Sequence, residues 1–182
     1  MVSASLLTAS IENVDFEPGE SKTHKYGLAV GMSEYFISLR AKVGADLLVI
    51  PGVSVLPWDP QGRLLLMRES SSGPWALVGG AVEPDEAPED AARREALEEV
   101  GVAVEITGIR AVLGGPLYRI KYENGDEVSY VSTVYDARIN NGEPTPDHDE
   151  VHELGWFSAE QLSSLELNDF ASATLHAIGV LG

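Results

Sequence analysis

The stretch of sequence that decides the fold runs from Gly80 to Val102 and reads GAVEPDEAPEDAARREALEEVGV. Residues 89–100 contain no glycine or proline, and a small or apolar side chain recurs every fourth residue at Ala92, Ala96 and Val100. This spacing predicts an amphipathic helix. The helix should end before Gly101, because glycine readily adopts the left-handed conformation that terminates helices.

Three glutamates of this helix form a candidate functional cluster. Glu95, Glu98 and Glu99 lie at positions i, i+3 and i+4, so their side chains leave the helix on one face. Like charges at this spacing cost a helix about 0.2–0.5 kcal/mol per pair, and a divalent cation among the carboxylates would remove that cost. The alternative is a solvated acidic face, since glutamate favours helices and the chain is acidic. Arg94 is placed to pair with a nearby acid and hold the geometry of the cluster.

Written as a pattern, the stretch is Gly80, five residues, Glu86, seven residues, and then Arg94-Glu95-Ala96-Leu97-Glu98-Glu99-Val100-Gly101-Val102. It resembles the signature of the Nudix hydrolase family, with Ala96 in the place of an aliphatic residue. A chance match at the seven fixed positions is rarer than about one in ten million per starting residue. The chain departs from the usual pattern at Val78, where relatives often have proline, and at Asp85, where they often have glycine.

The resemblance implies an α/β fold, a Nudix-type α/β/α sandwich with a mixed β-sheet. It also implies a Mg²⁺-dependent hydrolase, with Mn²⁺ as a substitute cation, that acts on phosphoric anhydride bonds. By this similarity the metal ligands are Glu95, Glu98, Glu99 and the backbone carbonyl of Gly80, one of the glutamates acting on the attacking water. Arg94 and Glu86 orient and brace that group.

Other candidates lie outside the signature. Relatives commonly take a further carboxylate from a loop, and the acidic stretch around Asp147, Asp149 and Glu150 is the predicted supplier here, with Glu150 as ligand or general base. Arg68 is the candidate phosphate contact. The candidates for stacking on a base are aromatic residues, namely Trp58, Tyr118 and Tyr122. Each of these residues has an ordinary structural alternative, either a solvated charge or a packed ring.

The substrate is left open between two classes. The first is a nucleoside diphosphate linked to another group, such as ADP-ribose, a choice slightly favoured by Pro116 shortly beyond the signature. The alternative is a modified nucleoside triphosphate, as in a pool-cleaning hydrolase. A third hypothesis is a non-catalytic sensor that binds a nucleotide and reports it to a partner.

Composition limits the other choices. Twelve lysines and arginines against 29 aspartates and glutamates give a formal net charge of −17, which disfavours nucleic-acid polymers and anionic membranes as partners. The chain has no cysteine, so thiolate catalysis and cysteine-ligated metals are excluded. No apolar run reaches the roughly 20 residues of a membrane span. We therefore expect a cytoplasmic protein with a small-molecule nucleotide substrate.

The chain reads as one domain over residues 32–182, preceded by an extension over 1–31. A short helix is predicted after Ser33 and up to Gly44; it either folds back on its own domain or offers a surface for a homodimer or lid. Period-two patterns and turn residues predict strands over 47–58, 63–67, 75–78, 102–113, 118–122, 128–139 and 154–157. Helical pieces are expected over 159–162 and 169–178.

Overall fold

The computed structural model describes residues 33–122, 124–148 and 150–182, so the predicted extension over 1–31 lies outside the described residues. The elements follow the predicted order closely. They are α1 (Glu34–Val43), β1 (Leu48–Trp58), β2 (Leu64–Arg68), α2 (Pro88–Val100), β3 (Val104–Leu113), the 3₁₀ turn η1 (Pro116–Tyr118), β4 (Arg119–Lys121), β5 (Glu127–Ile139), β6 (Glu153–Phe157), α3 (Ala159–Leu162) and α4 (Asp169–Ala177).

The strands form one mixed sheet in the order β3-β5-β1-β2-β6, with β4 added beside β5. β1 runs parallel to β5 along its whole length, from Leu48 opposite Val128 to Trp58 opposite Arg138. The other neighbouring strands are antiparallel. The mixed sheet that the sequence predicted is therefore confirmed.

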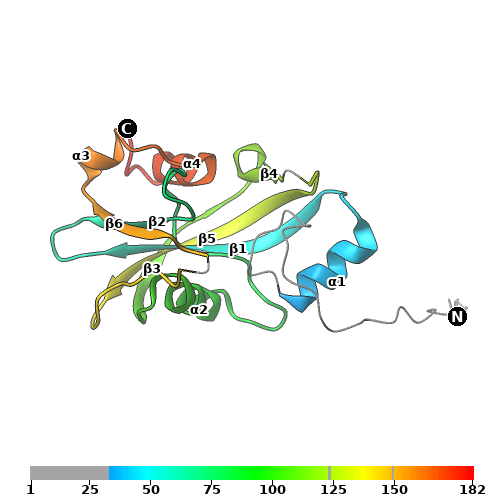
Figure 1. Ribbon diagram of the computed structural model, residues 1–182, viewed down its shortest axis with the longest axis horizontal. Coiled ribbons are helices and arrows are strands. Elements are labelled where there is room, and N and C mark those ends of the chain that lie inside the picture. Colours follow the sequence, from blue (N-terminus) through cyan, green and yellow to red (C-terminus); the bar gives the residue numbers. More distant parts are fainter. Residues whose placement is uncertain (1–32, 123, 149) are drawn as a thin grey trace, which may run out of the picture.

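Helices cover both faces of this sheet, with α2 below it and α4 above it in the view of Figure 1. On one face, the small side chains Ala92 and Ala96 of α2 let the helix pack closely on Val53 and Val55 of β1. On the other face, α3 and α4 bury apolar side chains against β1, β2 and β5. Each face thus has its own core, as the predicted α/β/α sandwich requires.

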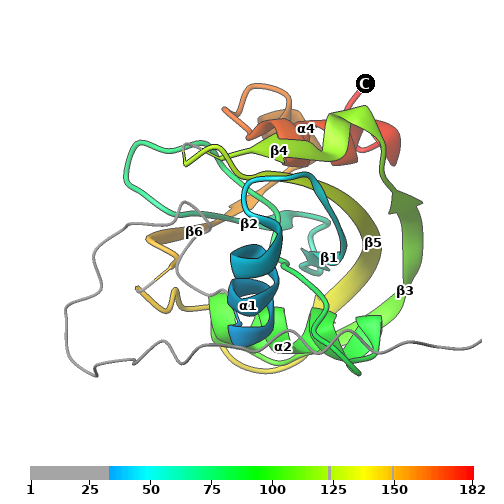
Figure 2. The same ribbon diagram turned by 90° about the vertical axis from the view of Figure 1, so that its right-hand side faces the viewer.

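Helix α1 lies at the end of the sheet where β1 begins (Figure 2). Ser33 caps its first turn by accepting the amide N–H of Phe36, and Gly44 ends it with a φ of 65°. Phe36 is buried against Ile50 and Val128. The helix therefore folds back on its own domain, which is the simpler of the two sequence expectations. Among the described residues, no helix is long and apolar enough to cross a membrane.

The strand predicted over residues 75–78 is wrong. This segment forms isolated bridges only, which join Trp75 to Leu167, Ala76 to Met67 of β2 and Val78 to Val55 of β1. It thus lies between β1 and β2, which pair directly only at Trp58 and Leu64. A segment this short that changes partner from one strand to the next cannot build a continuous ladder with either. Its insertion places the Gly79-Gly80 pair beside β1.

Candidate active site

Helix α2 carries the glutamate cluster where the sequence predicted it. Pro88 opens the helix, where its missing N–H costs nothing. Gly101 ends it in the left-handed conformation, and its N–H donates to the carbonyl of Leu97. Glu95, Glu98 and Glu99 therefore belong to one rigid helix that packs directly on the central strand β1.

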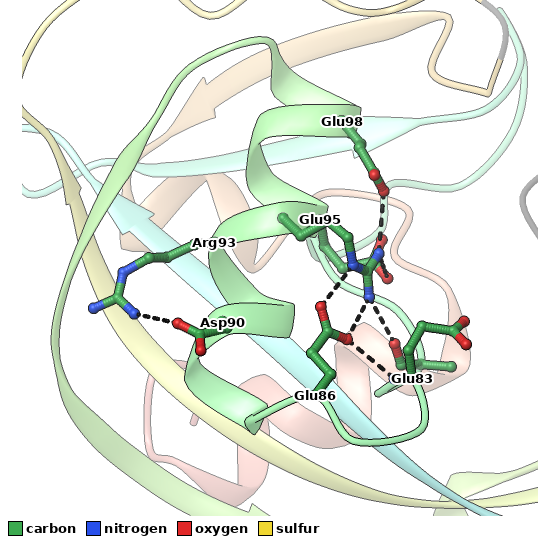
Figure 3. Close-up of polar contacts among 8 residues, drawn as sticks. Glu83, Glu86, Asp90, Arg93, Glu95 and Glu98 are labelled. Atoms are coloured by element: carbon green, nitrogen blue, oxygen red, sulfur yellow. Dashed lines mark hydrogen bonds and ion pairs between the residues drawn. The ribbon is translucent and has the colours of Figure 1, made fainter. Parts of the chain in front are cut away.

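Arg94 bonds to three glutamates of the signature, Glu86, Glu95 and Glu98, which are labelled in Figure 3. Its Nε and Nη2 atoms donate to the two carboxylate oxygens of Glu86 at 2.8 and 2.9 Å. Its Nη1 donates to Glu95 at 2.8 Å and to Glu98 at 3.1 Å, and Nη2 also reaches the carbonyl of Ala81 at 3.1 Å. The paired fork raises the pKa of Arg94 and lowers the pKa of Glu86, so both stay charged.

Glu86 also fixes the loop that leads into α2. One of its carboxylate oxygens accepts the backbone N–H of Glu83 at 3.0 Å, closing the turn around Pro84 (Figure 3). Asp85 adopts a φ of 63°, the left-handed region that favours glycine. The departure from the family pattern at this position is thus accommodated, because aspartate tolerates that conformation better than most residues.

Gly80 brings its backbone to the cluster. Its carbonyl oxygen accepts the N–H of Val53 at 2.9 Å and keeps a second lone pair. A Cβ atom added at Gly80 would lie 2.4 Å from Oε1 of Glu95, so the carboxylate occupies the space that a side chain would fill. The close approach of Glu95 to this backbone therefore requires glycine.

Glu99 is the most buried of the three glutamates, with 8% of its surface exposed. Burial raises the pKa of its carboxyl well above the ordinary value, although the N–H of Gly79 donates to its Oε2 at 2.8 Å and opposes the shift. The negative charges of Glu95, Glu150 and Asp147 raise this pKa further. Burial also raises the pKa of Glu95. A cation among these groups would offset both the desolvation cost of the buried carboxylates and the repulsion between them.

The donor set suits a hard divalent cation, since it consists of carboxylate oxygens and one free carbonyl lone pair. The side chains do not yet converge on one point: among the described residues, no three acidic or histidine side chains form a ready metal site. The reason is that Glu95 and Glu98 bond to Arg94, and Glu99 bonds to Gly79. A cation held by Glu95 and Glu98 would therefore compete with Arg94 for their carboxylate oxygens.

The remaining candidates lie as follows. Glu150 is in a loop where Asp147 accepts the N–H groups of Glu150 and Val151, and it acts electrostatically on Glu99. Arg68 pairs with Glu153 across β2 and β6, and its guanidinium lies 4.8 Å above the ring of Trp75. Glu153 and Trp75 lie outside the glutamate cluster. The contact of Arg68 with phosphate therefore stays a prediction.

The three aromatic candidates have different surroundings. Trp58 donates to Asp136 at 3.0 Å and lines a hollow of about 210 Å³ at the far end of β1. Tyr118 is buried in η1. Tyr122 is half-buried, and its hydroxyl lies 3.3 Å from that of Tyr130. A larger hollow of about 710 Å³ lies between η1 and α4, lined by residues other than the glutamates.

Sequence reasoning missed the backbone partners of the site. The N–H of Gly79 holds Glu99, and the carbonyl of Ala81 holds Arg94. Backbone groups are the same in every residue, so no residue type signals them. Tyr130 was also missed. Its ring and the carbonyl of Gly80 both lie 3.2 Å from a Cβ atom built at Gly52, and an alternating strand pattern does not reveal such a neighbour.

Comparison with known proteins identifies relatives of this chain. The sequence profile of the NUDIX domain family matches residues 49–177. The chain is 33% identical over 128 residues to the nucleoside triphosphatase NudI of Enterobacter sp. (strain 638), covering 66% of this chain and 90% of that protein. It is 31% identical to the solved MutT NUDIX hydrolase of Burkholderia pseudomallei, with a TM-score of 0.58 over 71% of this chain and 97% of that one.

An ADP-ribose pyrophosphatase from Streptococcus suis shares the fold, with a TM-score of 0.57 at 23% identity over 72% of this chain and 89% of that one. The family match spans most of the described chain and includes every glutamate of the cluster. The chain therefore belongs to the Nudix hydrolase family, and it is a hydrolase that acts on phosphoric anhydride bonds.

Proposed function

We propose that this chain is a Mg²⁺-dependent pyrophosphohydrolase of nucleotides, with Mn²⁺ as a substitute cation. The observation that carries the proposal is the placement of Glu95 and Glu99 against the Gly79-Gly80 backbone, with Arg94 holding Glu95 and Glu98 beside them. This arrangement places three carboxylates of one helix near the same stretch of backbone, in a chain that already carries a net charge of −17. Carboxylates repel an anionic diphosphate, so the proposed site would bind a diphosphate through a cation that lies between the two.

The residues have separate tasks in this proposal. Glu95, Glu98, Glu99 and the carbonyl of Gly80 would hold the cation, which when bound neutralises the diphosphate oxygens and makes water a better nucleophile. Arg94, anchored by Glu86, positions Glu95 and Glu98. Glu150, which acts electrostatically on Glu99, is the proposed general base.

Among substrates, we place nucleoside triphosphates ahead of ADP-ribose. The relatives named nucleoside triphosphatase NudI are 33–34% identical to this chain over much of the domain. The ADP-ribose pyrophosphatase shares the fold at lower identity. The single Pro116 that favoured ADP-ribose from the sequence begins η1 and lines the hollow beside α4 rather than the glutamate cluster.

The test is a hydrolysis screen of the purified full chain with and without Mg²⁺ or Mn²⁺. The panel contains the common and oxidised nucleoside triphosphates, ADP-ribose, sugar nucleotides and dinucleoside polyphosphates. Chromatography of the products separates a nucleoside monophosphate plus pyrophosphate from a monophosphate plus a sugar phosphate. Metal-dependent turnover of one class supports the proposal and names the substrate.

Two results would contradict it: no turnover of any nucleotide with saturating metal, or turnover that continues at full rate in a chelator. We also propose a cytoplasmic location, and the homodimer stays an open expectation beside it. Cell fractionation tests the location. Light scattering after size-exclusion chromatography tests the dimer.

A further inference from the structure

Two tyrosine side chains that the proposed chemistry does not use lie side by side near the glutamate cluster. The hydroxyls of Tyr122, which follows β4, and Tyr130, in β5, lie 3.3 Å apart and share a hydrogen bond. Both residues are only partly buried. We call these two residues the tyrosine pair.

Gly52 of β1 connects the tyrosine pair to the cluster. A Cβ atom added at Gly52 would lie 3.2 Å from the carbonyl oxygen of Gly80 and 3.2 Å from Cδ1 of Tyr130. The ring and the carbonyl therefore border the same side-chain-free stretch of backbone. Burial raises the pKa of Tyr130, and the negative charge of Glu95 raises it further. A group attached to a diphosphate at Gly80 thus has the tyrosine pair as its neighbour.

The chemistry of the tyrosine pair suits a neutral part of an anionic molecule. Burial raises the pKa of both hydroxyls, so each stays protonated and uncharged. One hydroxyl donates to the other, which leaves the proton of the second hydroxyl for an outside acceptor. Uncharged donors are valuable on an acidic protein, because carboxylates at this position would repel the substrate.

Packing holds the tyrosine pair in place. The edge of Phe170 in α4 meets Tyr130 at a centroid distance of 6.0 Å and Tyr118 at 5.1 Å. Both tyrosines of the pair also pack on the cluster around Phe36 of α1. Tyr118 contacts the same Phe170, yet its hydroxyl is buried with no hydrogen-bond partner among the described residues. Tyr118 is therefore a matched control within the same aromatic group.

We propose that Tyr122 and Tyr130 determine substrate specificity by binding the nucleoside part of the substrate, with the outward hydroxyl donating to an oxygen of the ribose or the base. This inference rests on the proposed function, because it takes the diphosphate to lie at Gly80 and Glu95. The oxygen acceptor has two sources, a ribose hydroxyl or a base carbonyl, and the substrates of the test distinguish them.

The experiment compares wild type, the double variant Tyr122→Phe/Tyr130→Phe and the control Tyr118→Phe. Steady-state kinetics are measured with ribonucleotides and deoxyribonucleotides of carbonyl-bearing bases and of adenine. We expect the double variant to raise KM about threefold to tenfold with kcat within about twofold, the loss expected for one neutral hydrogen bond. A loss confined to ribonucleotides identifies the ribose, and a loss confined to carbonyl-bearing bases identifies the base. Tyr118→Phe should match wild type.

Unchanged KM values in the double variant would overturn the inference and leave the proposed function standing. So would a fall in kcat that is equal for all substrates and accompanied by a lower melting temperature, since that marks a purely structural role. If wild type hydrolyses no nucleotide, the proposed function fails, and calorimetry of the same nucleotides in Ca²⁺ decides the inference. Weaker binding by the double variant would support it, and equal or absent binding would overturn it.

Discussion

The carboxylate of Glu95 fills the space that a side chain at Gly80 would need, because a Cβ atom built at Gly80 would lie 2.4 Å from Oε1 of Glu95. Gly79, its neighbour, is constrained differently. A Cβ atom at Gly79 would lie 2.2 Å from the backbone carbonyl of Val53, and its φ is 142°. Adjacent glycines thus serve the site and the fold respectively.

The first prediction follows from this contrast. Gly80→Ala should leave the free energy of unfolding nearly unchanged, because the flexible Glu95 side chain can move aside, but should lower kcat about 10- to 100-fold by displacing a carboxylate. Gly79→Ala meets backbone that cannot move and should lose more than about 2 kcal/mol of stability. Urea unfolding and kinetics measure both effects. Equal stability losses in the two variants would contradict the assignment.

The second prediction concerns Glu98, whose side chain is 59% exposed and pairs with Arg94. Glu98→Gln should leave stability unchanged and lower kcat by at least about 10- to 100-fold, the cost of losing even an outer partner of a bound metal. The matched control is Glu89→Gln on the same helix, which breaks an exposed ion pair with Arg93. Wild-type turnover by Glu98→Gln would remove this residue from the site.

The third prediction is a pH dependence carried by Glu99. Its pKa is raised in the folded protein, so between the unfolded and folded pKa values the folded state binds more protons. Stability from this group is therefore present at low pH and is lost as pH rises. In chelator at about pH 8, Glu99→Gln, which cannot ionise, should melt about 2–4 °C above wild type for each kcal/mol recovered. The difference should vanish near about pH 4, the ordinary range of a carboxyl pKa.

Mg²⁺ should reverse that order, since it stabilises the ionised carboxylate of wild type and gains less from the amide of the variant. The measurement is thermal unfolding of both proteins across pH, with and without metal. If the variant melts below wild type in chelator at every pH, the contacts of Glu99 stabilise the fold by more than the burial of its charge destabilises it, and the prediction is wrong.

The fourth prediction concerns Arg94, which serves three carboxylates and a backbone carbonyl with one planar fork. A lysine keeps the charge but cannot make paired bonds to Glu86. Arg94→Lys should therefore cost about 1–3 kcal/mol of stability and lower kcat, with metal affinity measured alongside by calorimetry. Arg93→Lys, which changes only exposed pairs with Glu89 and Asp90, is the control. Equal behaviour of the two variants would contradict the bracing role.

The fifth prediction tests the loop. Asp85 has a left-handed backbone conformation. This conformation costs most residues about 1–2 kcal/mol and costs aspartate less. Asp85→Gly should raise the free energy of unfolding by up to about 1 kcal/mol and keep the activity, whereas Asp85→Val should lower both. Chemical denaturation and kinetics check this. Destabilisation by glycine would show that the aspartate side chain itself holds the turn.

Local patterns made most of this fold predictable from the sequence. Both ends of α1 follow from Ser33 and Gly44, the C-terminal end of α2 follows from Gly101, and the spacing of three glutamates placed them on one helix face. The hairpin of β4 and β5 follows from its turn residues. What the sequence did not reveal depends on partners distant in the chain, such as the sharing of segment 75–78 between β1 and β2. Backbone contacts of Glu99 and Arg94 were hidden for the same reason.

The hydrogen bond from the N–H of Val53 to the carbonyl of Gly80 fixes one backbone atom of the site independently of the loops around it. The carbonyl is positioned by the main chain of the central strand, where no side-chain substitution can remove the donor except a proline. Loops on either side can therefore exchange residues, as Asp85 in place of glycine illustrates, while the carbonyl oxygen proposed as a cation ligand keeps its place. Substitutions in the loops around the site can therefore change substrate preference without moving the carbonyl of Gly80.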